Sequence, residues 1–154
     1  MKRILFSLLA VTFATAAIQA QRLVIGEKAP EIKVAEWQDG RTPSIAGKAY
    51  VVDFFLSSNS QCIDNLPKLH ALQTTHNGKL NVILISREGL DKVKPFTDGK
   101  RYEFYAGQDD NEKTFTGYSV RFVPFAALAD ARGRLVWTGN IASLTNEIIE
   151  KALK

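Results

Sequence analysis

Two stretches of the chain are apolar at nearly every position. The first runs from Tyr50 to Leu56 and is broken only by Asp53, and the second runs from Leu80 to Ser86. Runs of this length between turn residues predict strands that are covered on both faces of a sheet. Apolar residues at helical spacing between them predict a helix over Asn59 to His76, which Asn77-Gly78 ends. The apolar positions of this helix are Cys62, Leu66, Leu69 and Leu72.

The rest of the chain alternates between shorter helices and strands. Helical spacing predicts helices over residues 89–99, 111–118 and 144–153. Apolar runs predict strands over residues 102–106, 125–130 and 134–138, the last two joined as a hairpin by Ala131-Arg132-Gly133. Residues 23–34 are expected to form an extended lead-in, and residues 37–48 a loop with turns.

The order of these elements predicts the class of fold. A right-handed crossover makes the first two strands parallel, whereas the strands of the hairpin must be antiparallel. The chain is therefore predicted to be α/β, with a mixed central β-sheet and helices on both faces.

The first twenty residues have the pattern of a signal peptide. Lys2 and Arg3 precede an apolar run from Ile4 to Ala17, and Ala17 and Ala20 resemble the small residues of a cleavage site. The apolar run is shorter than the roughly 20 residues of a membrane-spanning helix. We predict cleavage after Ala20, a single domain over residues 21–154, no stable membrane insertion after cleavage, and export to the periplasm or the extracellular space.

Composition and charge fit one globular domain without a nucleic-acid surface. The chain has 154 residues, 45% of them hydrophobic, and a formal net charge of +4. Lys2 and Arg3 leave with the predicted signal peptide, so that 18 basic and 16 acidic side chains remain, a net charge of +2. No basic run is longer than two residues, and no nucleic-acid partner is expected.

Cys62 is the only cysteine of the chain, so an intrachain disulfide is impossible. It stands in the first turn of the predicted helix, where unpaired N–H groups and the positive end of the helix dipole stabilise a thiolate. A free cysteine is also often a small buried apolar residue. The sequence leaves both interpretations of this thiol open.

The turn before the predicted helix is rich in residues that cap helices. Ser57, Ser58, Asn59 and Ser60 all suit the N-cap position, and Ser58-x-x-Gln61 fits the capping-box pattern. The turn is therefore expected to start a helix, whether or not it carries chemistry.

This strand and turn resemble the active-site region of the thioredoxin superfamily, specifically its secreted TlpA/ResA-like thiol-disulfide branch. Members carry an aromatic strand end, a Trp-Cys-x-x-Cys turn and a helix proline five residues after the second cysteine. Phe55 stands at the strand end, Cys62 at the resolving cysteine and Pro67 at the helix proline. Ser58 replaces the tryptophan, and Asn59 replaces the attacking cysteine.

The resemblance extends over nearly all of residues 23–154 and implies the thioredoxin fold. Gly26 to Pro30 is similar to the Gly-x-x-Ala-Pro lead-in of TlpA-like domains. Family members place a buried acid at the position of Asp53, where it shuttles the proton of the resolving cysteine. The resemblance therefore implies that Asp53 is a buried base for Cys62, and a carboxylate turned toward water is the alternative. A buried carboxyl without a partner is expected to have a raised pKa.

Val123-Pro124 matches the cis-proline that faces the active-site turn in thioredoxin-like proteins. About 5–6% of X–Pro bonds are cis, so the cis prediction rests on the resemblance. In the family, the backbone before this proline pairs with an extended client peptide, a mode of binding that needs no redox chemistry. The resemblance implies a client-binding groove formed by Asn59, Ser60, Gln61, Val123 and Pro124.

No cofactor and no metal is predicted. Cys62, His70 and His76 share the predicted helix, but offsets of eight and fourteen residues turn His70 away from the other two. Zinc usually takes four ligands. The sequence has no phosphate-binding loop, paired catalytic carboxylates or Ser-His-Asp order.

Three functions remain open. The first is a binding module with a degenerate site that holds a protein client or ligand near Cys62 and Pro124. The second is a one-cysteine redox protein that forms mixed disulfides with a partner through Cys62. The third is a peroxiredoxin-like antioxidant. It ranks last because the Pro-x-x-x-Thr-x-x-Cys signature is absent: Phe55 and Asn59 stand at its proline and threonine positions. A resolving thiol alone has no intramolecular exchange to complete, so a dithiol cycle by this chain is excluded.

Overall fold

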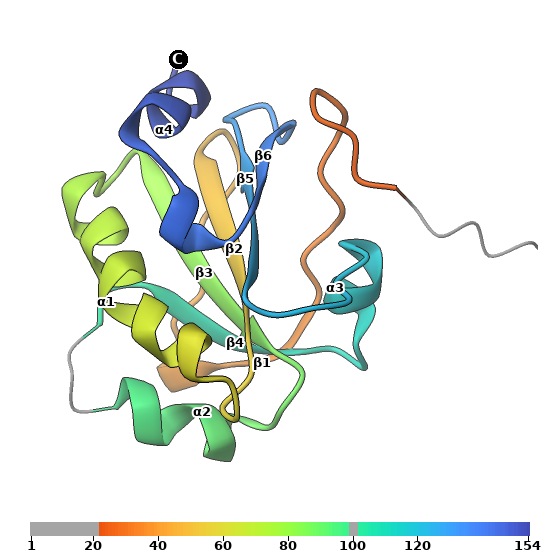
Figure 1. Ribbon diagram of the computed structural model, residues 1–154, viewed down its shortest axis with the longest axis vertical. Coiled ribbons are helices and arrows are strands. Elements are labelled where there is room, and N and C mark those ends of the chain that lie inside the picture. The colour runs from red at the N-terminus through yellow and green to blue at the C-terminus, as the bar shows by residue number, and fades with distance from the viewer. Residues whose placement is uncertain (1–21, 99–101) are drawn as a thin grey trace, which may run out of the picture.

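A mixed sheet of six strands forms the centre of the molecule in the computed structural model, which describes residues 22–98 and 102–154 (Figure 1). The strands lie in the order β1-β4-β3-β2-β5-β6. Their bounds are β1 Val34–Trp37, β2 Ala49–Phe55, β3 Leu80–Ser86, β4 Tyr105–Asp109, β5 Phe125–Ala129 and β6 Leu135–Gly139. Strands β2, β3 and β4 run parallel, whereas β1, β5 and β6 are antiparallel to their neighbours. The predicted mixed sheet is confirmed.

Helices cover both faces of this sheet, as predicted. One face carries α1 (Ser60–Thr75), α2 (Leu90–Thr97) and α4 (Asn146–Ala152), and the other carries α3 (Lys113–Gly117) (Figure 1). Two short 3-10 turns, η1 (Gln38–Gly40) and η2 (Ile141–Ser143), lie outside these helices.

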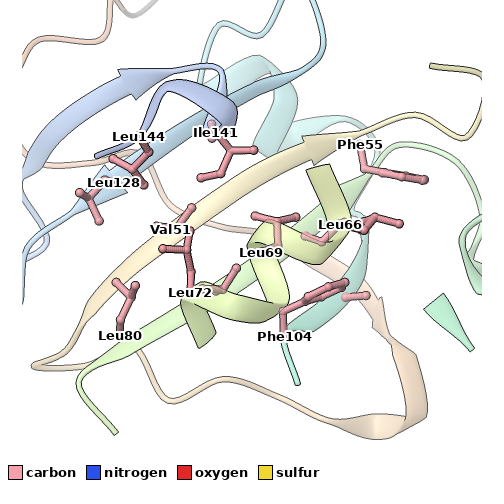
Figure 2. Close-up of a cluster of buried hydrophobic side chains, with 14 of the residues drawn as sticks. Val51, Phe55, Leu66, Leu69, Leu72, Leu80, Phe104, Leu128, Ile141 and Leu144 are labelled. Carbon is pink, nitrogen blue, oxygen red and sulfur yellow. The ribbon is translucent and has the colours of Figure 1, made fainter. Parts of the chain in front are cut away.

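Strand β2 is shared by two hydrophobic layers, since all seven of its residues are buried. Figure 2 shows Val51 and Phe55 in one layer, together with side chains of α1. The alternate residues Tyr50, Val52 and Phe54 belong to the second layer. Helix α1 contributes to the first layer the residues Cys62, Leu66, Leu69 and Leu72. Helix α3 contributes Phe115 to the second. Burial on both faces explains the continuous apolar run in the sequence.

Strand β4 begins and ends three residues later than predicted. It begins at Tyr105, whereas the expected strand covered residues 102–106. Tyr102 and Phe104 pack on the first layer from outside the strand. The Arg41 guanidinium donates hydrogen bonds to the carbonyls of Tyr102 and Glu103, at 3.5 and 2.9 Å, so those carbonyls are not free for a strand ladder.

Strand β1 was not predicted. The sequence analysis placed residues 23–34 in an extended lead-in and residues 37–48 in a loop, but Val34–Trp37 pairs antiparallel with β4. Only four residues long, β1 lies at the edge of the sheet, where pairing with β4 and not a long apolar pattern defines it.

The ends of three strands bring the site together. β2 and β3 are parallel, so the turns that follow Phe55 and Ser86 leave the sheet at the same edge. β5 is antiparallel to β2 and pairs Phe125 with Phe54, which places the loop before β5 at that edge too. Residues far apart in the sequence therefore meet near the start of α1.

The predicted signal peptide, residues 1–20, lies outside the described residues. No helix within residues 22–98 or 102–154 is both long enough and apolar enough to cross a bilayer.

Candidate functional site

Asn59 is the N-cap of α1. Its side-chain Oδ1 accepts a hydrogen bond from the Cys62 N–H at 3.0 Å. Ser58 was expected to start a capping box with Gln61, but the cap lies one residue later, and both of these side chains are exposed. Because the Asn59 oxygen already engages the Cys62 N–H, that donor is not free to bind a thiolate.

The same Asn59 amide reaches across the site. Its Nδ2 donates a hydrogen bond to the carbonyl of Val123, at 3.1 Å. The Val123-Pro124 peptide bond is cis, and this contact places it against the turn that opens α1. We call the contact from Asn59 to Val123 the amide clasp, since it joins two loops 64 residues apart in the sequence.

Cys62 has no exposed surface. Its Sγ lies 3.8 Å from the carbonyl oxygen of Phe54. The pKa of the Cys62 thiol is raised to about 11. Burial is the largest cause, the Asp53 and Glu88 carboxyls act in the same direction, and a hydrogen bond at the Leu56 backbone partly offsets them. The thiol is therefore protonated near neutral pH, and the thiolate expected from the helix start does not form.

Asp53 lies between Val51 and Phe55 on β2, on the same face of the sheet as Cys62. It has no exposed surface, and neither carboxyl oxygen has a hydrogen-bond partner among the described residues. Desolvation by burial raises the pKa of Asp53 well above its ordinary value, as the sequence analysis predicted for a buried acid. The carboxyl is close enough to the thiol to influence its titration.

Glu88 is a member of the site that the sequence analysis did not single out. Its carboxylate accepts hydrogen bonds from the Ser57 N–H at 2.6 Å and from the Ser57 hydroxyl at 2.9 Å. The Ser86 hydroxyl, at 3.4 Å, is a weaker third donor. Glu88 thereby ties the turn after β2 to the loop after β3. Its signal in the sequence was an acid two residues beyond a buried strand, at the edge where ligands bind in open α/β sheets.

The outer part of the site is exposed. Ser60 and Gln61 lie on the first turn of α1 and face solvent, whereas Val123 and Pro124 are half-buried. Next to them, Phe122 exposes 82% of its surface. The geometry thus brings Asn59, Cys62, Asp53, Val123 and Pro124 together, and it leaves Ser60 and Gln61 at the rim.

A sequence profile of the AhpC/TSA family matches residues 25–138 of the 154. The chain belongs to the AhpC/TSA family. No curated protein matches it.

Solved structures share the fold of this AhpC/TSA family chain. A protein from Chlorobium tepidum, assigned as a thiol:disulfide interchange protein DsbE, superposes with a TM-score of 0.75 and 20% identity, over 86% of this chain and 99% of that one. The thioredoxin domain of a thiol-disulfide oxidoreductase from Bacteroides vulgatus gives 0.71 and 19%, over 86% and 99% of the two chains. A thiol-disulfide isomerase from Corynebacterium glutamicum gives 0.68 and 19%, over 88% and 97%. These likenesses confirm the predicted thioredoxin fold.

The chemistry of this AhpC/TSA site is limited by its residues. The protonated Cys62 thiol and the Asp53 carboxyl, whose pKa burial raises, have no exposed surface, and an amide stands where the family resemblance places the attacking sulfur. Within the part of the chain that the structure describes, no group of three or more His, Cys, Asp and Glu side chains is arranged to hold a metal ion.

Proposed function

We propose that this protein is a thioredoxin-like binding module that holds a protein client at a degenerate site and does not run a dithiol/disulfide cycle alone. The amide clasp is the observation that carries this proposal. An amide has no sulfur to exchange, and here it joins the α1 turn to the cis-proline loop. In this proposal, the hydrogen bond of Asn59 stabilises the scaffold at the position where the family resemblance places a nucleophile.

The client surface in this proposal is the rim formed by Ser60, Gln61, Phe122, Val123 and Pro124. Aromatic side chains are enriched in protein interfaces relative to the rest of the surface. Phe122, with 82% of its surface exposed, supplies an apolar anchor. A client N–H that pairs with the Val123 carbonyl shares this oxygen with the Asn59 amide or replaces the amide there.

The one-cysteine redox function is the alternative. It is favoured by the Asp53 carboxyl, which is buried beside Cys62 and has no hydrogen-bond partner in the described residues. Such a function needs a proton acceptor near the thiol, and a carboxyl with a raised pKa serves as one when it is ionised. The thiol has to become exposed first, since Cys62 has no exposed surface. The peroxiredoxin-like function ranks third for the same reason and because its signature is absent.

Export belongs to the proposal as well. The charged start, short apolar run and small residues of residues 1–20 support removal of this segment, which leaves one domain over residues 21–154 in the periplasm or the extracellular space. The intact mass of the exported protein tests this directly, since cleavage after Ala20 leaves Gln21 as the first residue.

Partner capture from the exported fraction tests the client function. The wild type is compared with Cys62→Ser, Phe122→Ser and, as a matched control, Ile25→Ser. Ile25 is another exposed apolar residue, with 57% of its surface accessible, but it lies in the lead-in. We expect the same partner with the wild type, Cys62→Ser and Ile25→Ser, and at least a tenfold weaker recovery with Phe122→Ser, about the effect of one interface anchor.

Non-reducing electrophoresis distinguishes the one-cysteine redox function from the binding module. A partner that is disulfide-linked to the wild type and disappears with Cys62→Ser supports the one-cysteine function and contradicts the binding module. Equal recovery with Phe122→Ser and the wild type contradicts the proposed client surface.

A further inference from the structure

A groove of about 1050 Å³ opens on the face of the sheet opposite Cys62. Its walls are residues 28–33 of the lead-in, residues 45–47 before β2, the region of α3 and the hairpin turn at residues 131–133. The lead-in and α3 lie together on this side of the sheet (Figure 1). The volume is comparable to that of small-molecule sites, which span about 300–1,000 Å³. The groove does not include any residue of the thiol site.

Apolar side chains form part of the groove lining. Tyr50 is buried in the second hydrophobic layer and lines the groove, as do Ala29, Ile32 and Ile45. Burial raises the pKa of Tyr50, so its hydroxyl keeps its proton and stays a possible donor. A Cβ at Gly47 or Gly133 would have no atom within 4 Å apart from the adjacent residues of the chain, so both positions border open space.

The rim of the groove is positively charged. Four cationic side chains and one acidic side chain line it, a formal charge of +3 against +4 for the whole chain. Lys33 pairs with Glu31 at 3.4 Å, and Lys113 pairs with Asp110 at 2.6 Å. Lys28 and Arg132 have no ion-pair partner among the residues that the structure describes.

Backbone contacts hold these two unpaired cations on adjacent segments. Lys28 forms an antiparallel bridge with Arg134, and the Ala29 N–H donates to the Gly133 carbonyl at 2.8 Å. The one acid of the hairpin turn, Asp130, accepts hydrogen bonds from the backbone N–H groups of Arg132 and Arg134, at 2.9 and 3.0 Å. Its charge is thereby partly satisfied by the turn itself.

We propose that this groove binds a small amphipathic anion, with an apolar or aromatic body against Tyr50 and Ile32 and a carboxylate or phosphate head between Lys28 and Arg132. Apolar contact supplies most of the affinity in such a site, and the unpaired cations select the sign of the charge. The groove shares no residue with the proposed client surface, which lies at the end of the sheet where β2 and β3 finish, so the two functions stand or fall separately.

Titration of the ¹⁵N-labelled full chain with 4-phenylbutyrate tests the proposal. Phenyl phosphate serves as the second probe, and 4-phenylbutylamine, with the same body and the opposite charge, as the control. We expect saturable amide shifts at residues 28–33, 45–47 and 131–133 with a Kd below about 1 mM for at least one anion. The tighter anion identifies the head group, and the amine should cause no saturable shift.

Charge-reversal variants sharpen the test. Lys28→Glu and Arg132→Glu should each weaken anion binding about tenfold. Lys92→Glu is the matched control. Lys92 is an exposed residue of α2, which packs on the other face of the sheet, and this variant should bind the anions like the wild type. Equal binding of the amine, anion shifts confined to the region of Asn59 and Phe122, or unchanged affinity in both groove variants would overturn the proposal.

Discussion

Asp53 places a carboxyl group in the middle of strand β2, where none of its surface is exposed. Neither oxygen finds a hydrogen-bond donor among the described residues, so the charged form would be buried without compensation. Desolvation therefore raises the pKa of this carboxyl well above the ordinary value. The carboxyl also influences the titration of the Cys62 thiol, so the two buried groups are electrostatically coupled.

Asp53→Asn should therefore change how stability depends on pH. The native pKa of Asp53 exceeds the unfolded value of about 3.9, so the folded state binds more protons between the two values. The free energy of unfolding of the wild type should fall as the pH rises through this window, by about 1.4 kcal/mol per pH unit relative to the variant. Urea denaturation between pH 4.5 and 7 measures this slope.

Asp64→Asn is the control, because Asp64 is an exposed acid on α1. It should follow the wild type at every pH. Parallel pH profiles for Asp53→Asn and the wild type would show that Asp53 is ionised or paired in the folded protein.

At the scale of elements, the start of α1 is held by two side chains from two directions. Asn59 caps the helix and clasps the loop before β5, and Glu88 binds Ser57 from the loop after β3. The helix dipole at such a start contributes about 0.3–1 kcal/mol toward an anion. That contribution is smaller than the effect of burial, which leaves the Cys62 thiol protonated. Hydrogen bonds of Asn59 and Glu88 thus fix the position of the turn that opens α1.

Substitution of Asn59 should separate its two contacts. Asn59→Ala loses the cap and the clasp and should cost about 1–3 kcal/mol of unfolding free energy. Asn59→Asp keeps an oxygen for the Cys62 N–H but loses the donor to the Val123 carbonyl, so it should cost less, about 1 kcal/mol. Urea denaturation gives the stabilities, and amide hydrogen exchange at residues 121–123 reports on the loop that the clasp contacts.

Ser60→Ala is the matched control, since Ser60 is an exposed polar residue in the same turn, and it should stay within about 0.5 kcal/mol of the wild type. Exchange at residues 121–123 as slow in both Asn59 variants as in the wild type would mean that the clasp does not hold this loop.

For the whole molecule, the strands β2, β3 and β5 couple the two hydrophobic layers, since each contributes residues to both. Val51 packs in the first layer and Val52 in the second, and neither has exposed surface. The two tryptophans of the chain report on different layers, because Trp137 packs against the first and Trp37 against the second. Shared strands make the domain one cooperative unit.

Unfolding should therefore occur in one step. Val51→Ala and Val52→Ala should each cost about 2 kcal/mol, since each deletes buried methyl groups. We expect each to shift the midpoint equally whether Trp37 or Trp137 is the reporter, measured by fluorescence in Trp137→Phe and Trp37→Phe backgrounds. A variant that shifts the transition of one reporter alone would show that the layers unfold independently.

Most elements were predicted from the sequence within a few residues, because each carries its own apolar run or helical spacing. These are β2, β3, β5, β6 and the helices α1, α2, α3 and α4. The exceptions are β1, which was not predicted, and the bounds of β4. Both depend on pairing between segments about 70 residues apart, as Val34 with Asp109 shows. Glu88 was missed for a similar reason, because its role depends on where the β2 turn lies.

The sequence alone determined that this chain has one thiol, no intrachain disulfide and a continuous apolar strand that must be covered on both faces, because these properties depend on residue identity and local order. Only the tertiary structure decided that Cys62 is protonated and that Asn59 clasps Val123. Burial and the meeting of loops 64 residues apart are set by packing across the sheet, which local patterns do not encode.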